Sequence, residues 1–226
     1  MISHIAVLIP ARDEAQRIRE CLHSVAAAVD NCPIAASITV VADNCTDDTA
    51  HIARAFPRVT AIEISAGNVG IARATAAAHA LSATRVSPGS LWLANTDADS
   101  VVPDNWLTSQ ADIADRGYDI VIGTVRPDSR EYPLDAQREW ARTHIAGRPN
   151  GHIHGANLGV RASAYLDADG FRPIPEHEDV DLVERLARFR SIASDDAEVI
   201  TSARLAGRTP GGYAGYLRHL LRQSIP

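Results

Sequence analysis

The sequence of 226 residues contains no lysine, and all 22 of its basic residues are arginines. An anion bound by this protein must therefore be met by guanidinium groups or by backbone amides. The absence of lysine excludes the lysine of a Walker-type phosphate loop and the lysine that forms a Schiff base. Enzyme classes that depend on either group are excluded with them.

Cysteines are few, and long apolar runs are missing. Cys21, Cys32 and Cys45 form no Cys-x-x-Cys pair, so neither a disulfide framework nor a zinc site is supported, and we expect a cytoplasmic protein. The apolar run over residues 5–9 is too short for a signal peptide and has no basic flank. Because no run approaches the length of a membrane span, we expect no transmembrane segment.

A surplus of positive charge is also missing. The formal net charge is −6, which argues against a nucleic-acid partner. Residues 126–149 hold five arginines and four acids, so this stretch is interpreted as a solvated helix and loop, not a basic patch. With 46% apolar and 22% charged residues, the composition is that of an ordinary globular protein.

Strand-like and helix-like segments alternate through the first hundred residues. Apolar patterns predict strands at residues 4–9, 38–42, 59–64 and 91–95, and helices at residues 14–29, about 49–56 and about 70–81. This alternation predicts a parallel sheet whose carboxyl edge gathers the loops at Pro10, Asp43, Gly67 and Asp97. None of these loops contains Gly-x-Gly-x-x-Gly, which disfavours a dinucleotide-binding dehydrogenase.

The second half of the sequence is less regular. We expect helices at residues 103–113, from 176 onward and at 213–221, with strands at 120–123 and 155–160 and an edge strand at 199–202. His152 and His154 precede the 155–160 strand and are candidates to face a substrate. A structural or solvated role is the alternative for both.

The apolar run at residues 91–95 leads into two carboxylates one residue apart, Asp97 and Asp99. Two acids at a strand end can converge on one hard cation such as Mg²⁺ or Mn²⁺, which prefers oxygen ligands and leaves positions for phosphates. The same spacing also occurs in turns where an aspartate caps a following helix. The motif alone leaves both interpretations open.

Five short motifs occur in a fixed order along the chain. They are PARDE at 10–14, VADNCTDDT at 41–49, Asn68-x-Gly70 followed by Arg73, DAD at 97–99, and Glu178-Asp179 before Asp181-Leu182. In this order they resemble the motifs of glycosyltransferase family 2, and the resemblance extends from the first strand through Leu186. Asp13 stands where the family usually has asparagine, and Ala42 replaces the first aspartate of the second motif.

The resemblance implies an α/β protein of the GT-A fold, with a Rossmann-like, mixed but mostly parallel sheet flanked by helices. It implies one domain over 1–226, in which 1–99 bind the nucleotide and 100–226 the acceptor. The implied activity is metal-dependent transfer of a sugar from a nucleotide-diphospho-sugar, with a UDP-sugar favoured, to an unknown hydroxyl acceptor. Inversion at the anomeric carbon is expected, and a retaining relative is the alternative. The sugar and the oligomeric state are left open.

The resemblance also assigns roles to residues. Nucleotide-sugar binding is assigned to Pro10, Ala11, Arg12, Glu14, Asp43, Asn68, Gly70, Arg73 and Asp97. Asp99 is expected to ligate Mg²⁺ or Mn²⁺ directly, with Asp97 near the ribose or reaching the ion through water. Catalysis is assigned to Asp179 and Glu178, with Asp179 preferred as general base because it is the second acid of the pair.

Arg208 is added to the nucleotide-sugar-binding set. It lies among three glycines and a proline within residues 204–212, a composition that suits a mobile loop. In a chain without lysine, a guanidinium brought in by loop closure would add charge-assisted bonds to the leaving diphosphate. A solvated loop before the last helix is the alternative.

Two other functions compete with sugar transfer. A sugar-nucleotide-forming nucleotidyltransferase would be expected to carry a glycine-rich loop with a basic side chain after the first strand, and residues 10–14 contain no glycine. A catalytically silent nucleotide-sugar-binding module is the other. The presence of both Asp99 and Asp179 argues against a module without catalytic activity.

Overall fold

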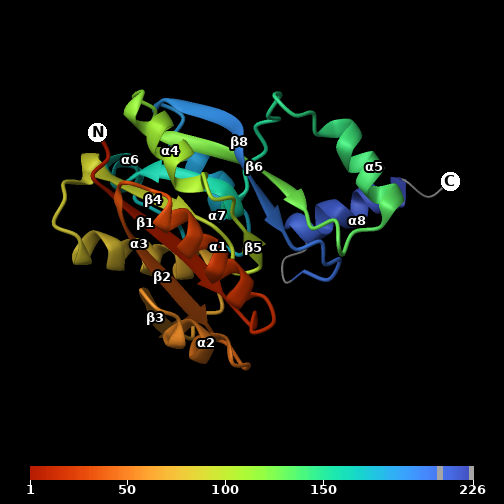
Figure 1. The fold of residues 1–226 in the computed structure, drawn as a ribbon, viewed down its shortest axis with the longest axis horizontal. Coiled ribbons are helices and arrows are strands. Elements are labelled where there is room, and N and C mark those ends of the chain that lie inside the picture. The colour runs from red at the N-terminus through yellow and green to blue at the C-terminus, as the bar shows by residue number, and fades with distance from the viewer. Residues whose placement is uncertain (208–210, 224–226) are drawn as a thin grey trace.

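The computed structural model describes residues 1–207 and 211–223, and their strands form one eight-stranded sheet flanked by helices (Figure 1). The strand order is β3-β2-β1-β4-β7-β6-β8-β5. None of the helices in these described ranges combines the length and the apolar character needed to cross a membrane.

The first half alternates strand and helix as the sequence predicts. Its elements are β1 (His4–Ala11), α1 (Ile18–Asp30), β2 (Ala35–Asp43), α2 (Thr49–Ala55), β3 (Val59–Ile64), α3 (Val69–Ala83), a 3₁₀ turn (Pro88–Ser90) and β4 (Leu91–Asn95). β1 pairs in parallel with β2 and β4, and β2 pairs in parallel with β3. The carboxyl ends of these four strands therefore share one edge, where ligands bind in open α/β sheets.

The second half makes the sheet mixed. Its elements are β5 (Ser100–Val101), α4 (Trp106–Asp115), β6 (Ile120–Pro127), α5 (Leu134–Thr143), a 3₁₀ turn (Gly155–Asn157), β7 (Leu158–Arg161), α6 (Ala162–Asp167), α7 (Glu178–Arg185), β8 (Ser191–Thr201) and α8 (Tyr213–Gln223). β7 is antiparallel to β4 and β6, whereas β8 is parallel to β6 and antiparallel to β5.

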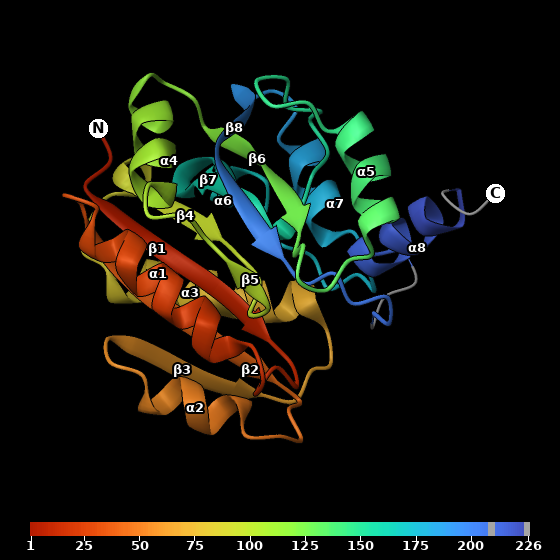
Figure 2. The same ribbon diagram turned by 45° about the vertical axis from the view of Figure 1, so that its right-hand side comes forward.

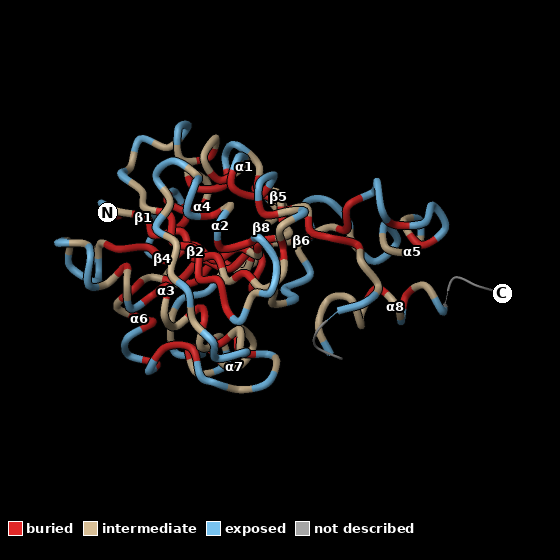
Figure 3. Tube along the Cα trace, turned by 90° about the horizontal axis from the view of Figure 1, so that it is seen from below, coloured by how far each residue is buried: buried red, intermediate tan, exposed pale blue. Residues whose placement is uncertain are grey.

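Helices cover both faces of the sheet (Figure 2). The apolar stripe of α1 packs with α4 in one core cluster, and the alanines of α3 pack with α6 and α7 in the other. A third, smaller cluster joins α5 and α8, which lie side by side beyond the main body of the molecule (Figure 3). The small side chains of α3 allow this helix to lie close to the strands.

Several predicted element boundaries are wrong; the helix predicted at 103–113 is α4 (Trp106–Asp115), and the strand predicted at 120–123 continues to Pro127 as β6. The strand predicted at the edge over 199–202 is β8, which starts at Ser191 and lies between β6 and β5. The strand predicted at 155–160 begins at Leu158, after a 3₁₀ turn. The first helix begins at Ile18 because Glu14 opens a turn, in which its carbonyl accepts from the amides of Arg17 and Ile18.

The side chain of Asn157 connects α4, β6 and β8 through hydrogen bonds. Its Nδ2 donates to the carbonyls of Thr124 in β6 and Ala197 in β8, both at 2.9 Å, and its Oδ1 accepts from Trp106 Nε1 of α4 at 2.9 Å. A Cβ at Gly123 would lie 2.2 Å from Asn157 Cγ, so the glycine makes room for the amide. The side chain therefore fills the irregularity between Gly123 and Val125 in the β6–β8 register.

We predict that Asn157→Leu lowers the free energy of unfolding by about 3 kcal/mol, because a buried indole N–H and two carbonyls lose their partner. Urea unfolding followed by circular dichroism measures this change. Asn31→Leu, at an exposed asparagine that bonds only within its own helix, is the matched control and should change the free energy by less than about 0.5 kcal/mol. Equal effects of the two substitutions would contradict a structural role for Asn157.

Candidate active site

A cavity of about 750 Å³ opens at the carboxyl edge of the sheet. Its lining brings together most of the residues that the sequence singled out: Pro10, Ala11, Arg12, Glu14, Asp43, Asn68, Arg73, Asp97, Asp99, Glu178 and Asp179. His152 and His154 line it as well. Gly70 is not part of the lining, and Arg208 lies outside the described residues.

Arg73 is the buried centre of this cavity. Its side chain is 2% exposed, its Nε donates to Glu178 Oε1 at 3.1 Å, and its Nη2 donates to Asp97 Oδ1 at 2.6 Å. Its remaining nitrogen, Nη1, has no hydrogen-bond partner among the described residues, although it is buried. A buried guanidinium nitrogen without a partner is a donor available to a ligand. A Cβ at Gly155 would lie 2.3 Å from Arg73 Nη2, so glycine is needed there.

Glu178 and Asp179 open α7 and have different surroundings. Glu178 is buried against Arg73, and burial raises the pKa of its carboxyl group in spite of the nearby guanidinium. Asp179 instead accepts from backbone amides, its Oδ2 from Gly155 N at 2.6 Å and its Oδ1 from Val180 N at 2.8 Å. The two amides orient the Asp179 carboxylate, whereas Glu178 is held in an ion pair.

Asp97 and Asp99 follow β4 and present carboxylates to the cavity. Asp97 is 37% exposed and gives one oxygen to Arg73. Asp99 is more enclosed, with its Oδ2 3.0 Å from Arg204 Nη2. Burial, together with the charge of Asp97, raises the pKa of Asp99 to about 6. Two carboxylates facing one cavity at a strand end form a donor set that fits Mg²⁺ or Mn²⁺.

Arg204 is a site residue that the sequence analysis missed. Its guanidinium bridges Asp99 and Glu14, with Nη1 2.8 Å from Glu14 Oε1. The sequence analysis assigned the cationic role in this stretch to Arg208 because glycines surround it. The better signal was the position of Arg204 just after the buried end of β8, which brings it to the same edge of the sheet.

Two residues of the predicted donor loop have packing roles. Asn68 caps α3 through its Oδ1, which accepts from Ile71 N at 3.0 Å, and its Nδ2 donates to the Ile174 carbonyl at 2.8 Å. A Cβ at Gly70 would lie 2.2 Å from the Arg172 carbonyl oxygen. Both residues therefore join α3 to the segment before α7, and their contacts with a nucleotide stay a prediction.

Asp43 fixes the same loop from the end of β2. Its two carboxylate oxygens accept from Gly67 N at 2.8 Å and Asn68 N at 2.7 Å. The side chain is buried but lines the cavity. Arg12 lies beside this loop, because a Cβ at Gly67 would be 3.8 Å from its Nη1. Hydrogen bonds to Asp43 thus hold the loop beside Arg12 in place, and contacts of Arg12 and Asp43 with a nucleotide stay a prediction.

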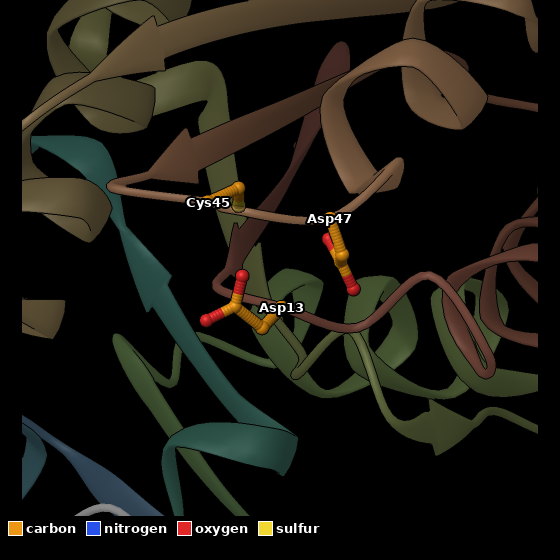
Figure 4. A group of neighbouring side chains, drawn as sticks. All are labelled: Asp13, Cys45 and Asp47. Atoms are coloured by element: carbon orange, nitrogen blue, oxygen red, sulfur yellow. The ribbon is translucent and has the colours of Figure 1, made fainter.

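A second group of possible metal ligands lies outside this cavity. Asp13, Cys45 and Asp47 place one ligand atom each within 4.8 Å of one another (Figure 4). Both carboxylates already accept hydrogen bonds from loop amides, however. Asp13 Oδ1 accepts from Thr46 N at 2.6 Å, and Asp47 Oδ2 accepts from Ala15 N at 3.0 Å. The group therefore ties the loop after β1 to the loop after β2.

Asp13 also explains one departure from the family motif. Its φ is 47°, in the left-handed region that aspartate and asparagine tolerate better than most other residues. The Thr46 amide lowers the pKa of the Asp13 carboxyl group, so the acceptor stays ionised. Aspartate therefore meets the same backbone requirement as the asparagine that is usual there.

The fold is similar to solved structures of larger proteins. The mannosyltransferase PcManGT from Pyrobaculum calidifontis, in complex with GDP-Man and Mn²⁺, matches with a TM-score of 0.67 at 18% identity over 100% of this chain and 62% of that chain. S. aureus TarS 1–349 in complex with UDP-GlcNAc matches at 0.67 and 15% identity over 98% of this chain and 65% of that chain. This chain thus spans less than two thirds of either.

A third match is less close in shape. The glucosyl-3-phosphoglycerate synthase of M. tuberculosis matches with a TM-score of 0.58 at 18% identity, over 99% of this chain and 78% of that chain. Identities this low show the fold alone, which is the predicted GT-A fold. No curated protein sequence matches significantly. The family model described as Glycosyl transferase family 2 matches residues 6–169, and the chain therefore belongs to that family.

Proposed function

We propose that the protein transfers a sugar from a nucleotide-diphospho-sugar to an acceptor hydroxyl, with a divalent cation as cofactor. The observation that carries this proposal is that Asp97 and Asp99 of the first half and Asp179 of the second line the same cavity. One side offers oxygen ligands for a cation, and the other offers a carboxylate oriented to receive a proton. Family membership supports the proposal.

The donor belongs in the half built from β1, β2 and β4. Arg12 and the Asp43 loop form the slot for the base, with the Pro10 carbonyl and the Ala11 amide beside it. The free Nη1 of Arg73 is a donor for a phosphate or sugar oxygen. Mg²⁺ or Mn²⁺ held by Asp99, with Asp97, would supply charge neutralisation for the leaving diphosphate. We favour a UDP-sugar; among the similar structures, TarS contains UDP-GlcNAc and PcManGT contains GDP-Man.

The acceptor belongs in the half formed by residues 100–226, within a single domain. Asp179 takes the proton of the attacking hydroxyl, and the amides of Gly155 and Val180 hold its carboxylate in place. Glu178 serves as a positioning residue through its ion pair with Arg73. One displacement with one base inverts the anomeric centre. The cytoplasmic location expected from the cysteine pattern stays a prediction.

Incubation with Mn²⁺ and a panel of UDP-, GDP- and TDP-sugars tests this function. Release of nucleoside diphosphate, slow in water and faster with an acceptor, is the expected result. Exchange of pyrophosphate into a nucleotide sugar would indicate a nucleotidyltransferase. Binding without turnover across a broad acceptor panel would indicate a silent module, and either of these results would contradict the proposal.

Asp99→Asn is predicted to reduce the gain in nucleoside diphosphate affinity that Mn²⁺ gives by at least about tenfold, or about 1.4 kcal/mol. The amide keeps the shape of the side chain but is a poorer ligand for a hard cation. Calorimetric titration with and without Mn²⁺ measures the gain. Asp104→Asn, at an exposed position after β5, is the control, and an undiminished gain in Asp99→Asn would refute the assignment.

Asp179→Asn is predicted to lower kcat by roughly 10²–10⁴-fold, the range typical of lost general-base catalysis. The asparagine side chain can still accept a hydrogen bond from the Gly155 amide. The dissociation constant of the nucleotide-sugar donor should therefore stay within about twofold. Steady-state kinetics and donor titration measure the two quantities. Glu178→Gln is the comparison: a larger loss of kcat in that variant, with an unchanged kcat in Asp179→Asn, would move the base to Glu178.

A further inference from the structure

Four rings cluster, mostly edge to face, on the acceptor side of the cavity. His152 and His154 come from the loop before β7, and Tyr213 and Tyr216 come from α8. We call these four residues the ring wall. Their ring centroids follow one another in a closed circuit, with separations of 6.3 Å (His152–His154), 5.5 Å (His154–Tyr213), 6.0 Å (Tyr213–Tyr216) and 6.3 Å (Tyr216–His152).

The ring wall has support from behind. Trp140 of α5 stacks on His144 at 4.0 Å, and the His144 ring is 6.3 Å from His152 and from Tyr216. The small core between α5 and α8 fixes this arrangement, since Tyr132 is buried and its hydroxyl donates to the Leu217 carbonyl at 3.1 Å. Packing against this core thus holds the two tyrosines in place, whereas His152 lies on an exposed loop.

The wall lies next to the proposed base. His154 directly precedes Gly155, whose amide donates to Asp179 Oδ2 at 2.6 Å. Asp179, Tyr213 and Tyr216 line the same cavity. A molecule lying on the rings therefore has a short path to the carboxylate that would take its proton.

The charges of the described residues around the wall disfavour an anion. Burial lowers the pKa of His154 to about 4, so this ring is uncharged at neutral pH. Among the described residues, the arginines that line the cavity are Arg12, beside Gly67 in the donor half, and Arg73 and Arg204, each paired with two carboxylates. A phosphate or carboxylate on the acceptor would face Asp179 and Glu176 without a described arginine on its own side of the cavity.

We propose that the ring wall binds a pyranose ring of an uncharged glycoside, which presents the acceptor hydroxyl to Asp179. This inference rests on the proposed function and names its acceptor class. The C–H face of a pyranose is apolar and suits the faces of aromatic rings, while ring nitrogens and phenol groups can bond the hydroxyls at its rim. Mostly apolar walls with a few polar groups are typical of small-molecule sites.

Saturation-transfer NMR with Mg²⁺ and a nucleoside diphosphate tests the ring wall. The probes are the methyl pyranosides of glucose, galactose and mannose, with 3-phosphoglycerate as the anionic probe. We expect transfer to the ring C–H protons of at least one pyranoside and none to phosphoglycerate. Binding of phosphoglycerate without binding of any pyranoside would overturn the inference.

Substitutions locate the binding. Tyr216→Ala should weaken the affinity for the bound pyranoside about tenfold, and Tyr216→Phe, which keeps the ring, should weaken it less than about threefold. His152→Ala, at an exposed loop position, is the second variant and guards against a folding defect in α8. Tyr118→Ala, outside the cavity lining, is the control. Affinities unchanged in both Tyr216→Ala and His152→Ala would also overturn the inference.

A measurement of nucleotide-sugar hydrolysis in water, made beside the pyranoside binding, tests the proposed function independently of this inference. Donor turnover without binding of pyranosides would leave sugar transfer intact and refute the ring wall as a glycoside site. Binding of pyranosides at the wall without binding or turnover of any nucleotide sugar would support the wall and refute the proposed transferase.

Discussion

One buried guanidinium connects the two halves of the molecule. Arg73 comes from the first turns of α3, yet it bonds Asp97 after β4 and Glu178 at the start of α7. Removal of one partner from a buried ion pair leaves a charge that water cannot reach, and this is costly in free energy. The position of α7, and with it the carboxylate of Asp179, therefore depends on the same residue that orients the Asp97 carboxylate. One side chain therefore sets the positions of the carboxylates proposed for the metal and for the general base relative to each other.

Most of the sheet could be predicted because its strands are buried apolar runs separated by amphipathic helices. β1, β2 and β4 follow that pattern, whereas β3 is a half-exposed strand at the edge of the sheet. Each of the four ends in the loop that the sequence predicted at the cavity edge. β8 could not be predicted in full, since Ser191 to Glu198 are largely half-exposed and polar and owe their strand to pairing with β6. Pairing partners distant in sequence leave no local pattern.

Most of the residues that line the cavity could be predicted from the sequence, whereas the hydrogen bonds and ion pairs among them could not. Short motifs identify Asp97, Asp99 and Asp179, because each lies directly after a strand or at the start of a helix. Motifs do not reveal that Asn68 caps a helix, or that Arg204 lies between Asp99 and Glu14. These contacts join segments far apart in the chain, and they become visible only when the fold brings the segments together.

A crystal structure with nucleoside diphosphate and Mn²⁺ tests the central claim, that the cavity is a metal–diphosphate site facing an acceptor base. Anomalous scattering locates the manganese without ambiguity. The account predicts one ion bonded to Asp99, directly or with Asp97, and to the diphosphate, with Asp179 across the same cavity. Manganese bound at Asp13, Cys45 and Asp47 instead, or a diphosphate bound away from Asp97 and Asp99, would contradict it.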